Sequence, residues 1–127
     1  MRKTKITEAQ FSLFKKECAK WINIFGLKNW ELRYFLDGGD KKSYAWVNYN
    51  HDNRVADLYL TNDWAELNIL PTNEQIKHTA FHEVMEIFLY PLRYLAEARY
   101  VLGWETIDCA IHDIIRTLET VVFYQKK

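Results

Sequence analysis

The segment that decides the fold runs from residue 71 to residue 90 and reads PTNEQIKHTAFHEVMEIFLY. Thr72 and Gln75 have the spacing of a capping box, in which two side chains satisfy free backbone N–H groups at the start of a helix. We therefore predict a helix that opens here and runs to Tyr90. Pro91 has no backbone N–H, so it is predicted to end or kink that helix. Residues 92 to 102 are predicted to form a further helical piece.

A metal-ligand pattern lies on this helix at His82-Glu83-Val84-Met85-Glu86. His82 and Glu86 are four residues apart, so they lie on one face about one turn from each other. This separation suits two ligands of one metal ion. Glu83 projects about 100° around the helix from His82, at the position that holds the general base in the HExxH motif. Here a glutamate replaces the second histidine of that motif.

The third ligand predicted for this site is His112. Zinc accepts a carboxylate oxygen at about 2.0–2.2 Å, much as it accepts an imidazole nitrogen, and a catalytic zinc takes three protein ligands. His112 lies on the last predicted helix, which can pack antiparallel to the motif helix. His78, His82 and Glu86 recur every four residues and together cover about 12 Å of helix axis, which is too long for all three to bind one ion. Glu119 lies two turns beyond His112 and is interpreted either as a residue that supports a metal ligand without binding the ion or as an ion-pair residue.

The other elements follow from hydrophobic periodicity. Thr7 and Gln10 form a capping box, and the helix that they open has one apolar stripe and ends at Gly26. Three strand-like runs follow at residues 30–36, 44–49 and 55–61, with a polar hairpin link between the last two in which His51 is interpreted as a turn residue. The final helix spans residues 105 to 124. The predicted stripe of the first helix is Phe11, Phe14, Cys18, Trp21 and Phe25, and that of the last is Ile107, Ile111, Ile114, Leu118 and Val121.

This order predicts a single α+β domain over residues 1–127, with an N-terminal helix, a three-stranded antiparallel-rich sheet, the motif helix and a C-terminal helix. The chain has 17 basic and 17 acidic residues and a formal net charge of zero, which argues against binding to nucleic acid by bulk charge. Cys18 and Cys109 form no CxxC pair, so we expect a reducing compartment, and Cys109 is expected to be a buried structural cysteine. Apolar runs are too short for a membrane span, so the expected location is the cytoplasm.

Two segments carry a resemblance to a known family. Residues 80–86, AFHEVME, followed by residues 111–119, IHDIIRTLE, resemble small bacteriophage and prophage zincin-like proteins, which in turn resemble minimal SprT-like metallopeptidase domains. The resemblance implies a zincin-like fold and one zinc ion bound by His82, Glu86 and His112, with Glu83 as general base. It also implies that a substrate backbone lies along a sheet edge beside the motif helix, for which the strand at residues 55–61 is the expected candidate.

Two main hypotheses follow, and a third is a small nucleic-acid-associated protein, which the resemblance to SprT-like domains suggests and the neutral charge opposes. The first is a zinc-dependent hydrolase, a metallopeptidase acting on protein or peptide substrates, in which Glu83 takes the proton of the attacking water. Tyr90, Tyr94 and Tyr100 follow the motif and are interpreted as packing aromatics, with donation to an oxyanion as the alternative. The second is a non-catalytic phage protein that keeps the zincin fold as a metal-binding module or as an interaction module for a phage or host protein. Both place the protein in the host cytoplasm if a phage encodes it.

Overall fold

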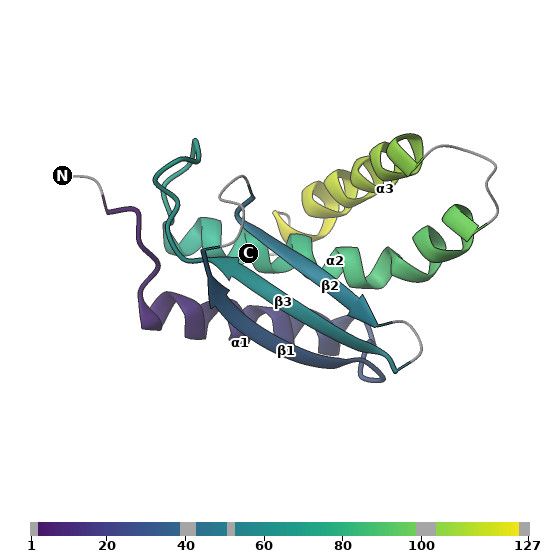
Figure 1. Ribbon diagram of the computed structural model, residues 1–127, viewed down its shortest axis with the longest axis horizontal. Helices are drawn as coiled ribbons and strands as arrows, with labels where there is room; N and C mark the ends of the chain where they lie inside the picture. The colour runs from purple at the N-terminus through teal and green to yellow at the C-terminus, as the bar shows by residue number, and fades with distance from the viewer. Residues whose placement is uncertain (1–2, 39–42, 51–52, 99–103, 125–127) are drawn as a thin grey trace.

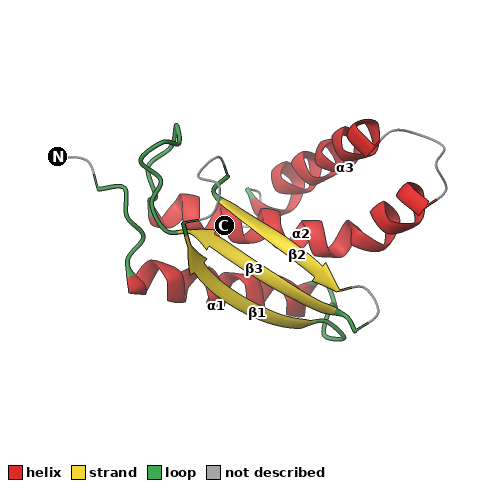
Figure 2. Ribbon diagram, viewed as in Figure 1, coloured by secondary structure: helices red, strands yellow, loops and turns green. Residues whose placement is uncertain are grey.

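The computed structural model describes residues 3–38, 43–50, 53–98 and 104–124. Their arrangement is α+β, as predicted (Figures 1 and 2). The helices and strands are α1 (Glu8–Ile24), β1 (Glu31–Asp37), β2 (Ala45–Asn50), β3 (Val55–Thr61), α2 (Asn73–Ala98), α3 (Trp104–Leu118) and the π-helix η1 (Glu119–Phe123).

The sheet of the described residues has three strands in the order β1-β3-β2. β2 and β3 form the predicted antiparallel hairpin, but β1 pairs with β3 in parallel, so the sheet is mixed rather than antiparallel-rich. The reason is the path of the chain. After β1 it crosses to the far edge of the sheet to form β2, and the hairpin then returns it to the centre in the direction of β1. β3 is therefore the central strand, and β2 is an edge strand.

One face of the sheet is covered by α1 and α2, and α3 lies along α2 on the side of β2 (Figure 1). Ala56, Leu58 and Leu60 of β3 alternate with partly exposed residues and are fully buried against this helical layer. Between the two helices, Trp21 of α1 meets Phe81 of α2 edge to face, with ring centroids 4.8 Å apart. The apolar core therefore lies between the sheet and the α1–α2 pair.

The first helix has the predicted ends and the predicted buried stripe. Thr7 Oγ1 accepts a hydrogen bond from the backbone N–H of Gln10, and the Gln10 side chain accepts one from the N–H of Thr7, at 3.0 and 3.1 Å. Gly26 has a φ of +68°, the left-handed conformation that favours glycine after a helix. Phe14, Cys18 and Trp21 are buried. Local capping and periodicity thus fix this element.

Pro91 was predicted to end or kink the motif helix. It does not end the helix, because α2 continues to Ala98. Contacts on both sides of the proline hold the helix together. Tyr90 stacks on Tyr49 of β2, with ring centroids 4.1 Å apart, and Arg93 forms ion pairs with Glu86 and with α3. These contacts offset the one backbone hydrogen bond that a proline removes.

Two predictions for the last helix are also wrong. Ile114 is 42% exposed, whereas Ile115 is fully buried, so the buried face of α3 follows Ile107, Ile111 and Ile115 at steps of four residues. Cys109 is exposed and free rather than buried, because it lies off that face. The cause is that α3 buries only the side that meets α2. The side chain of Val121 lies outside the described residues.

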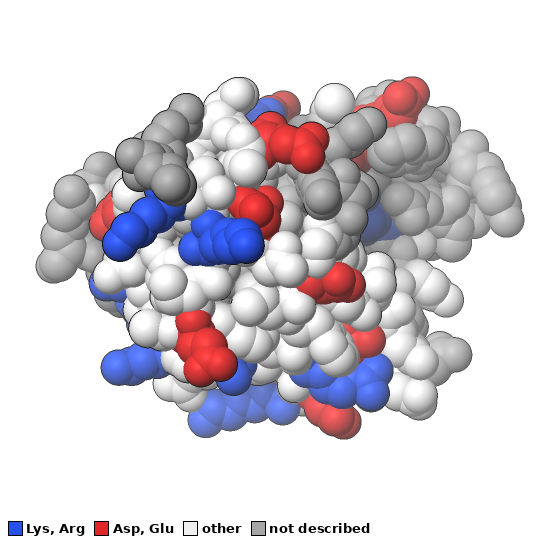
Figure 3. All heavy atoms as spheres, turned by 60° about the vertical axis from the view of Figure 1, so that its left-hand side comes forward, with Lys and Arg blue, Asp and Glu red and all other residues white. Residues whose placement is uncertain are grey.

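Charges of both signs are interspersed over the face shown in Figure 3, with several lysine and arginine side chains gathered along its lower edge. This distribution agrees with the zero net charge of the sequence. Within the described ranges, none of the helices combines the length and the apolar character that crossing a bilayer requires.

Candidate metal centre

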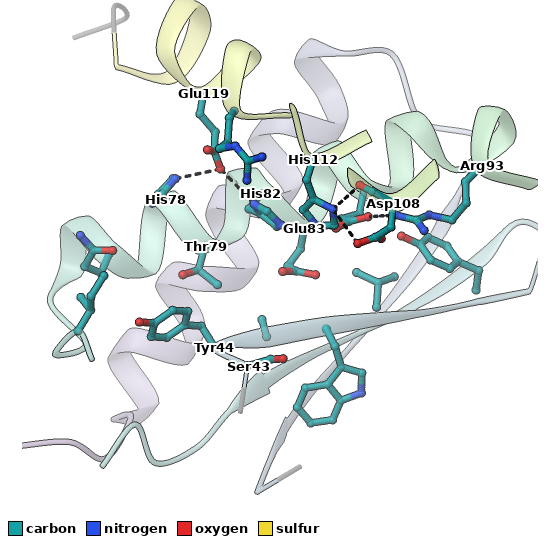
Figure 4. Close-up of a pocket in the computed structure, with 18 of the residues that line it drawn as sticks. Ser43, Tyr44, His78, Thr79, His82, Glu83, Arg93, Asp108, His112 and Glu119 are labelled. Carbon is teal, nitrogen blue, oxygen red and sulfur yellow. Dashed lines mark hydrogen bonds and ion pairs between the residues drawn. The ribbon is translucent and has the colours of Figure 1, made fainter. Parts of the chain in front are cut away.

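The structure brings together the three side chains that the sequence analysis predicted as metal ligands. Nε2 of His112 lies 2.9 Å from Oε2 of Glu86, and Nε2 of His82 lies 3.5 Å from the same oxygen. One ligand atom from each residue lies within 4.8 Å of the other two. The three side chains therefore converge between α2 and α3, where Figure 4 shows His82 and His112 close together.

The donor set and spacing fit a divalent metal ion. Around a tetrahedral zinc with bonds of about 2.0–2.2 Å, neighbouring ligand atoms are roughly 3.3–3.6 Å apart. Of the two distances to the Glu86 oxygen, 3.5 Å lies in that range and 2.9 Å is shorter. Two imidazoles and one carboxylate are also a known ligand set for catalytic zinc, which leaves a fourth position for water or substrate.

Packing of α3 delivers His112 to the site. Ile111 and Ile115 are buried in the core, and they fix the rotation of α3 about its axis. The adjacent residue His112 is thereby turned towards α2, where Glu86 lies. His82 is one turn before Glu86 on α2, so the two helices present their ligands to each other (Figure 4).

The Nδ1 atom of each histidine ligand has a partner on α3 or η1. Nδ1 of His82 lies 3.1 Å from Oε2 of Glu119. Nδ1 of His112 lies 2.9 Å from the main-chain oxygen of Asp108, one turn earlier on α3, and 3.3 Å from the Asp108 carboxylate. Both rings therefore keep Nε2 directed towards Glu86.

These carboxylates are held in turn by residues of α2. Nε2 of His78 lies 2.9 Å from Oε2 of Glu119, and Nη2 of Arg93 lies 2.8 Å from Oδ1 of Asp108. Arg93 also lies 3.3 Å from Oε1 of Glu86. Together these contacts form a chain of polar side chains between α2 and the α3–η1 segment. We call it the polar seam; its members are His78, His82, Glu86, Arg93, Asp108, His112 and Glu119.

The prediction for Glu119 as an ion-pair residue is confirmed; His78 lies against Glu119 and is not one of the three residues whose ligand atoms converge. Sequence reasoning missed Arg93 and Asp108. Asp108 lies one turn before His112 on the same helix face, and this spacing was a usable signal. Arg93 was missed because it lies after Pro91, where a kink or a new helical piece was predicted, so its direction relative to Glu86 could not be derived from helix periodicity.

Glu83 is a buried carboxyl group beside the ligands, with 7% of the residue exposed. Burial raises its pKa to about 7; the neighbouring His82 opposes this shift, and Glu86 adds to it. A general base works best when its pKa lies near the working pH. The environment of Glu83 therefore suits proton transfer at neutral pH.

The charges around the ligands favour a bound cation. Burial lowers the pKa of His82, but hydrogen bonds with Glu119 and Glu86 outweigh this effect and raise it to about 10. Burial raises the pKa of Glu119, but His78 and His82 outweigh it and hold the pKa at about 2. The metal-free site thus keeps a proton on His82 between two carboxylates, at the place where a metal ion would carry the positive charge.

The three ligands and Glu83 lie in a cleft of about 890 Å³. The cleft is bounded by β2 on one side and by α2 and α3 on the other (Figure 4). The expectation that β3 (residues 55–61) is the edge strand beside the motif is wrong, because β3 is paired on both sides. The strand that lines the cleft is β2, through Ala45, Trp46, Val47 and Tyr49.

Tyr90 and Tyr94, which were interpreted as packing aromatics with donation to an oxyanion as the alternative, lie outside the lining of the cleft in the described part of the chain. Tyr90 stacks on Tyr49, and Tyr94 is 42% exposed. Tyr100 lies outside the described residues, as does His51 in the hairpin. Tyr44 and Tyr49 of the β2 segment line the cleft instead.

No protein-family model matches the sequence. No curated protein matches it either, nor does any solved structure. The resemblance to zincin-like proteins therefore rests on the two quoted segments alone, and a function has to be argued from the residues of the cleft.

Proposed function

We propose that the protein is a zinc-dependent hydrolase of the zincin type, a metallopeptidase that binds one zinc ion through His82, Glu86 and His112. The observation that supports this most is the convergence of two imidazole nitrogens and one carboxylate oxygen within 4.8 Å of one another. The buried carboxyl group of Glu83 beside them distinguishes this arrangement from a simple surface cluster of charges.

A zinc ion bound here supplies the polarisation of a water molecule and of a peptide carbonyl. Glu83 accepts the proton of the attacking water, for which a pKa of about 7 makes it a suitable base. Tyr44 and Tyr49 are hydroxyl-bearing side chains on the wall of the same cleft.

The substrate proposed is an extended peptide or protein segment, bound along β2. Among the described residues, β2 pairs only with β3, so one side of its backbone faces away from the sheet. An extended chain adds to such an edge through main-chain hydrogen bonds. The cleft lies between this strand and the ligand-bearing helices, which brings a peptide on β2 close to Glu83.

The experiment is Glu83→Gln, which keeps the size of the side chain and removes the base. We expect the variant to bind one equivalent of zinc by metal analysis and to lose activity on a fluorescently labelled protein by about 10²- to 10⁴-fold. Glu17→Gln is the matched control, because Glu17 is a comparably buried glutamate, on α1 and outside the lining of the cleft. Unchanged hydrolysis in Glu83→Gln, or loss of its zinc, would contradict the assigned role.

A second candidate is a non-catalytic zincin-like protein in which the metal fastens the α3–η1 segment to α2, as a module that binds a phage or host protein. The observation that favours it is that the ligands come from two helices, so that an ion would cross-link them. In that case the wild-type protein binds zinc and gains stability from it, but wild type and Glu83→Gln hydrolyse the labelled substrate equally slowly.

A further inference from the structure

The two histidine ligands of the proposed site share one arrangement. In both, Nε2 faces Oε2 of Glu86, and Nδ1 faces an oxygen acceptor. For His82 the acceptor comes from the opposite helical segment, and for His112 it comes from the same helix, one turn earlier. A neutral imidazole that donates its lone pair from Nε2 must carry its proton on Nδ1. An oxygen acceptor at Nδ1 stabilises that tautomer and fixes the plane of the ring.

The acceptors differ in strength. His82 has the carboxylate of Glu119 at 3.1 Å. His112 has the main-chain oxygen of Asp108 at 2.9 Å, and the Asp108 carboxylate follows at 3.3 Å. Removal of the Asp108 side chain therefore leaves His112 with one acceptor. Removal of the Glu119 side chain takes away the Nδ1 acceptor that the structure gives to His82.

The location of Glu119 at a change of helix type supports a specific role. α3 ends at Leu118 and η1 begins at Glu119. The backbone N–H of Tyr124 donates to the main-chain oxygen of Glu119, five residues back, at 3.0 Å. Short π-helical turns in proteins are frequent at functional sites. Here the turn coincides with a carboxylate that is 9% exposed as a side chain and that contacts two histidines of α2, His78 and His82.

From this geometry we infer that Glu119 is the main positioning residue of the metal centre, that Asp108 is a weaker one, and that His78 is not a ligand but holds Glu119 in place. This inference rests on the proposed zinc site. It orders the residues of the polar seam other than Arg93 by their effect on metal affinity, with the ligands first, Glu119 next, and Asp108 and His78 last.

The test is the dissociation constant for zinc alone, measured by competition with a chelating dye, in protein shown to be folded by circular dichroism. We expect Glu119→Ala to raise the constant by about 10- to 100-fold, as is usual for the loss of a partner of a ligand histidine. Asp108→Ala and His78→Ala are expected to raise it less. Asp113→Ala is the matched control, because this carboxylate of α3 is 73% exposed as a side chain and binds Arg116 outside the seam.

Glu119→Gln is a second variant that is less disruptive to folding, since it keeps the side-chain volume and a neutral acceptor. Its zinc affinity should lie between those of wild type and Glu119→Ala. The absorption bands of the cobalt(II)-loaded protein give a second readout, because they report ligand geometry and do not respond to a loss of stability alone. We expect them to shift in both Glu119 variants and to stay unchanged in Asp113→Ala.

Several results would overturn the inference. Zinc affinity of the Glu119 variants within about threefold of wild type, with unchanged cobalt bands, would remove the positioning role. A loss in His78→Ala as large as that in His112→Ala would make His78 a ligand. If wild-type protein binds no zinc, the proposed function fails as well. If wild type binds zinc and the Glu119 variants bind it equally, only this inference fails.

Discussion

The two sides of α2 are built from opposite chemistry. The side that faces α1 and the sheet is apolar, with Ala80, Phe81 and Val84 fully buried. The side that faces α3 carries the polar seam, in which histidines and acidic groups are held by one another and by Arg93. Apolar burial stabilises a fold in a way that is nearly independent of pH and metal ions, whereas a seam of charged groups depends on both. One helix therefore connects an apolar core to a polar region whose stability depends on pH and, if the proposed site binds zinc, on the metal ion.

The largest expected effect tests the apolar side. Leu58 lies in the central strand and is fully buried, so Leu58→Ala leaves a cavity and should lower the free energy of unfolding by about 2–5 kcal/mol. Urea unfolding measures it. Zinc affinity at low temperature, where the variant remains folded, should stay at the wild-type value. A changed affinity would show that the core and the polar seam are not separate in this way.

A smaller effect tests the polar seam, by removal of one of the side chains proposed to bind zinc. Zinc at about 100 times its dissociation constant should stabilise the wild-type protein by about 2.7 kcal/mol. His112→Ala removes one of three ligands, so the same zinc concentration should give almost no stabilisation. Thermal unfolding with and without zinc measures both values. Equal stabilisation of the two proteins would mean that zinc binds somewhere else.

A third effect concerns pH in the metal-free protein. The pKa of Glu119 is lowered from 4.5 to about 2 in the folded state, where His78 and His82 outweigh the opposite effect of burial. A lowered carboxyl pKa contributes stability above the unfolded value, and that stability is lost as the pH falls from about 4.5 to about 2. Urea unfolding over this range should therefore show a flatter decline in Glu119→Gln than in wild type.

Asp113→Asn is the control for that series, because Asp113 is an exposed carboxylate of the same helix. Its decline in stability should follow that of the wild-type protein. If the Glu119→Gln and wild-type curves have the same slope between pH 4.5 and pH 2, the carboxylate of Glu119 does not contribute in the way that its contacts indicate.

Much of the secondary structure could be predicted because it depends on neighbours in the chain. The capping box at Thr7 and the stripe along α1 are local patterns, and β3 has the predicted bounds. The spacing of His82 and Glu86 also needed only the geometry of one helix. Predictions failed where the structure depends on contacts between residues far apart in the chain. The continuation of α2 past Pro91 depends on contacts with Tyr49 and α3. The parallel pairing of β1 with β3 depends on the path of the chain.

For the candidate site, the sequence by itself determined which residue types stand one turn apart on α2 and that His112 is available on a later helix. Only the tertiary structure decided that His112 meets Glu86, that Glu119 and Asp108 support the two histidines, and that β2 rather than β3 borders the cleft. The physical reason is that helix periodicity fixes the direction of a side chain within its own element. The rotation and the partner of each helix are set by burial of apolar groups far apart in the chain, such as Ile111 and Ile115 against α2 and the core.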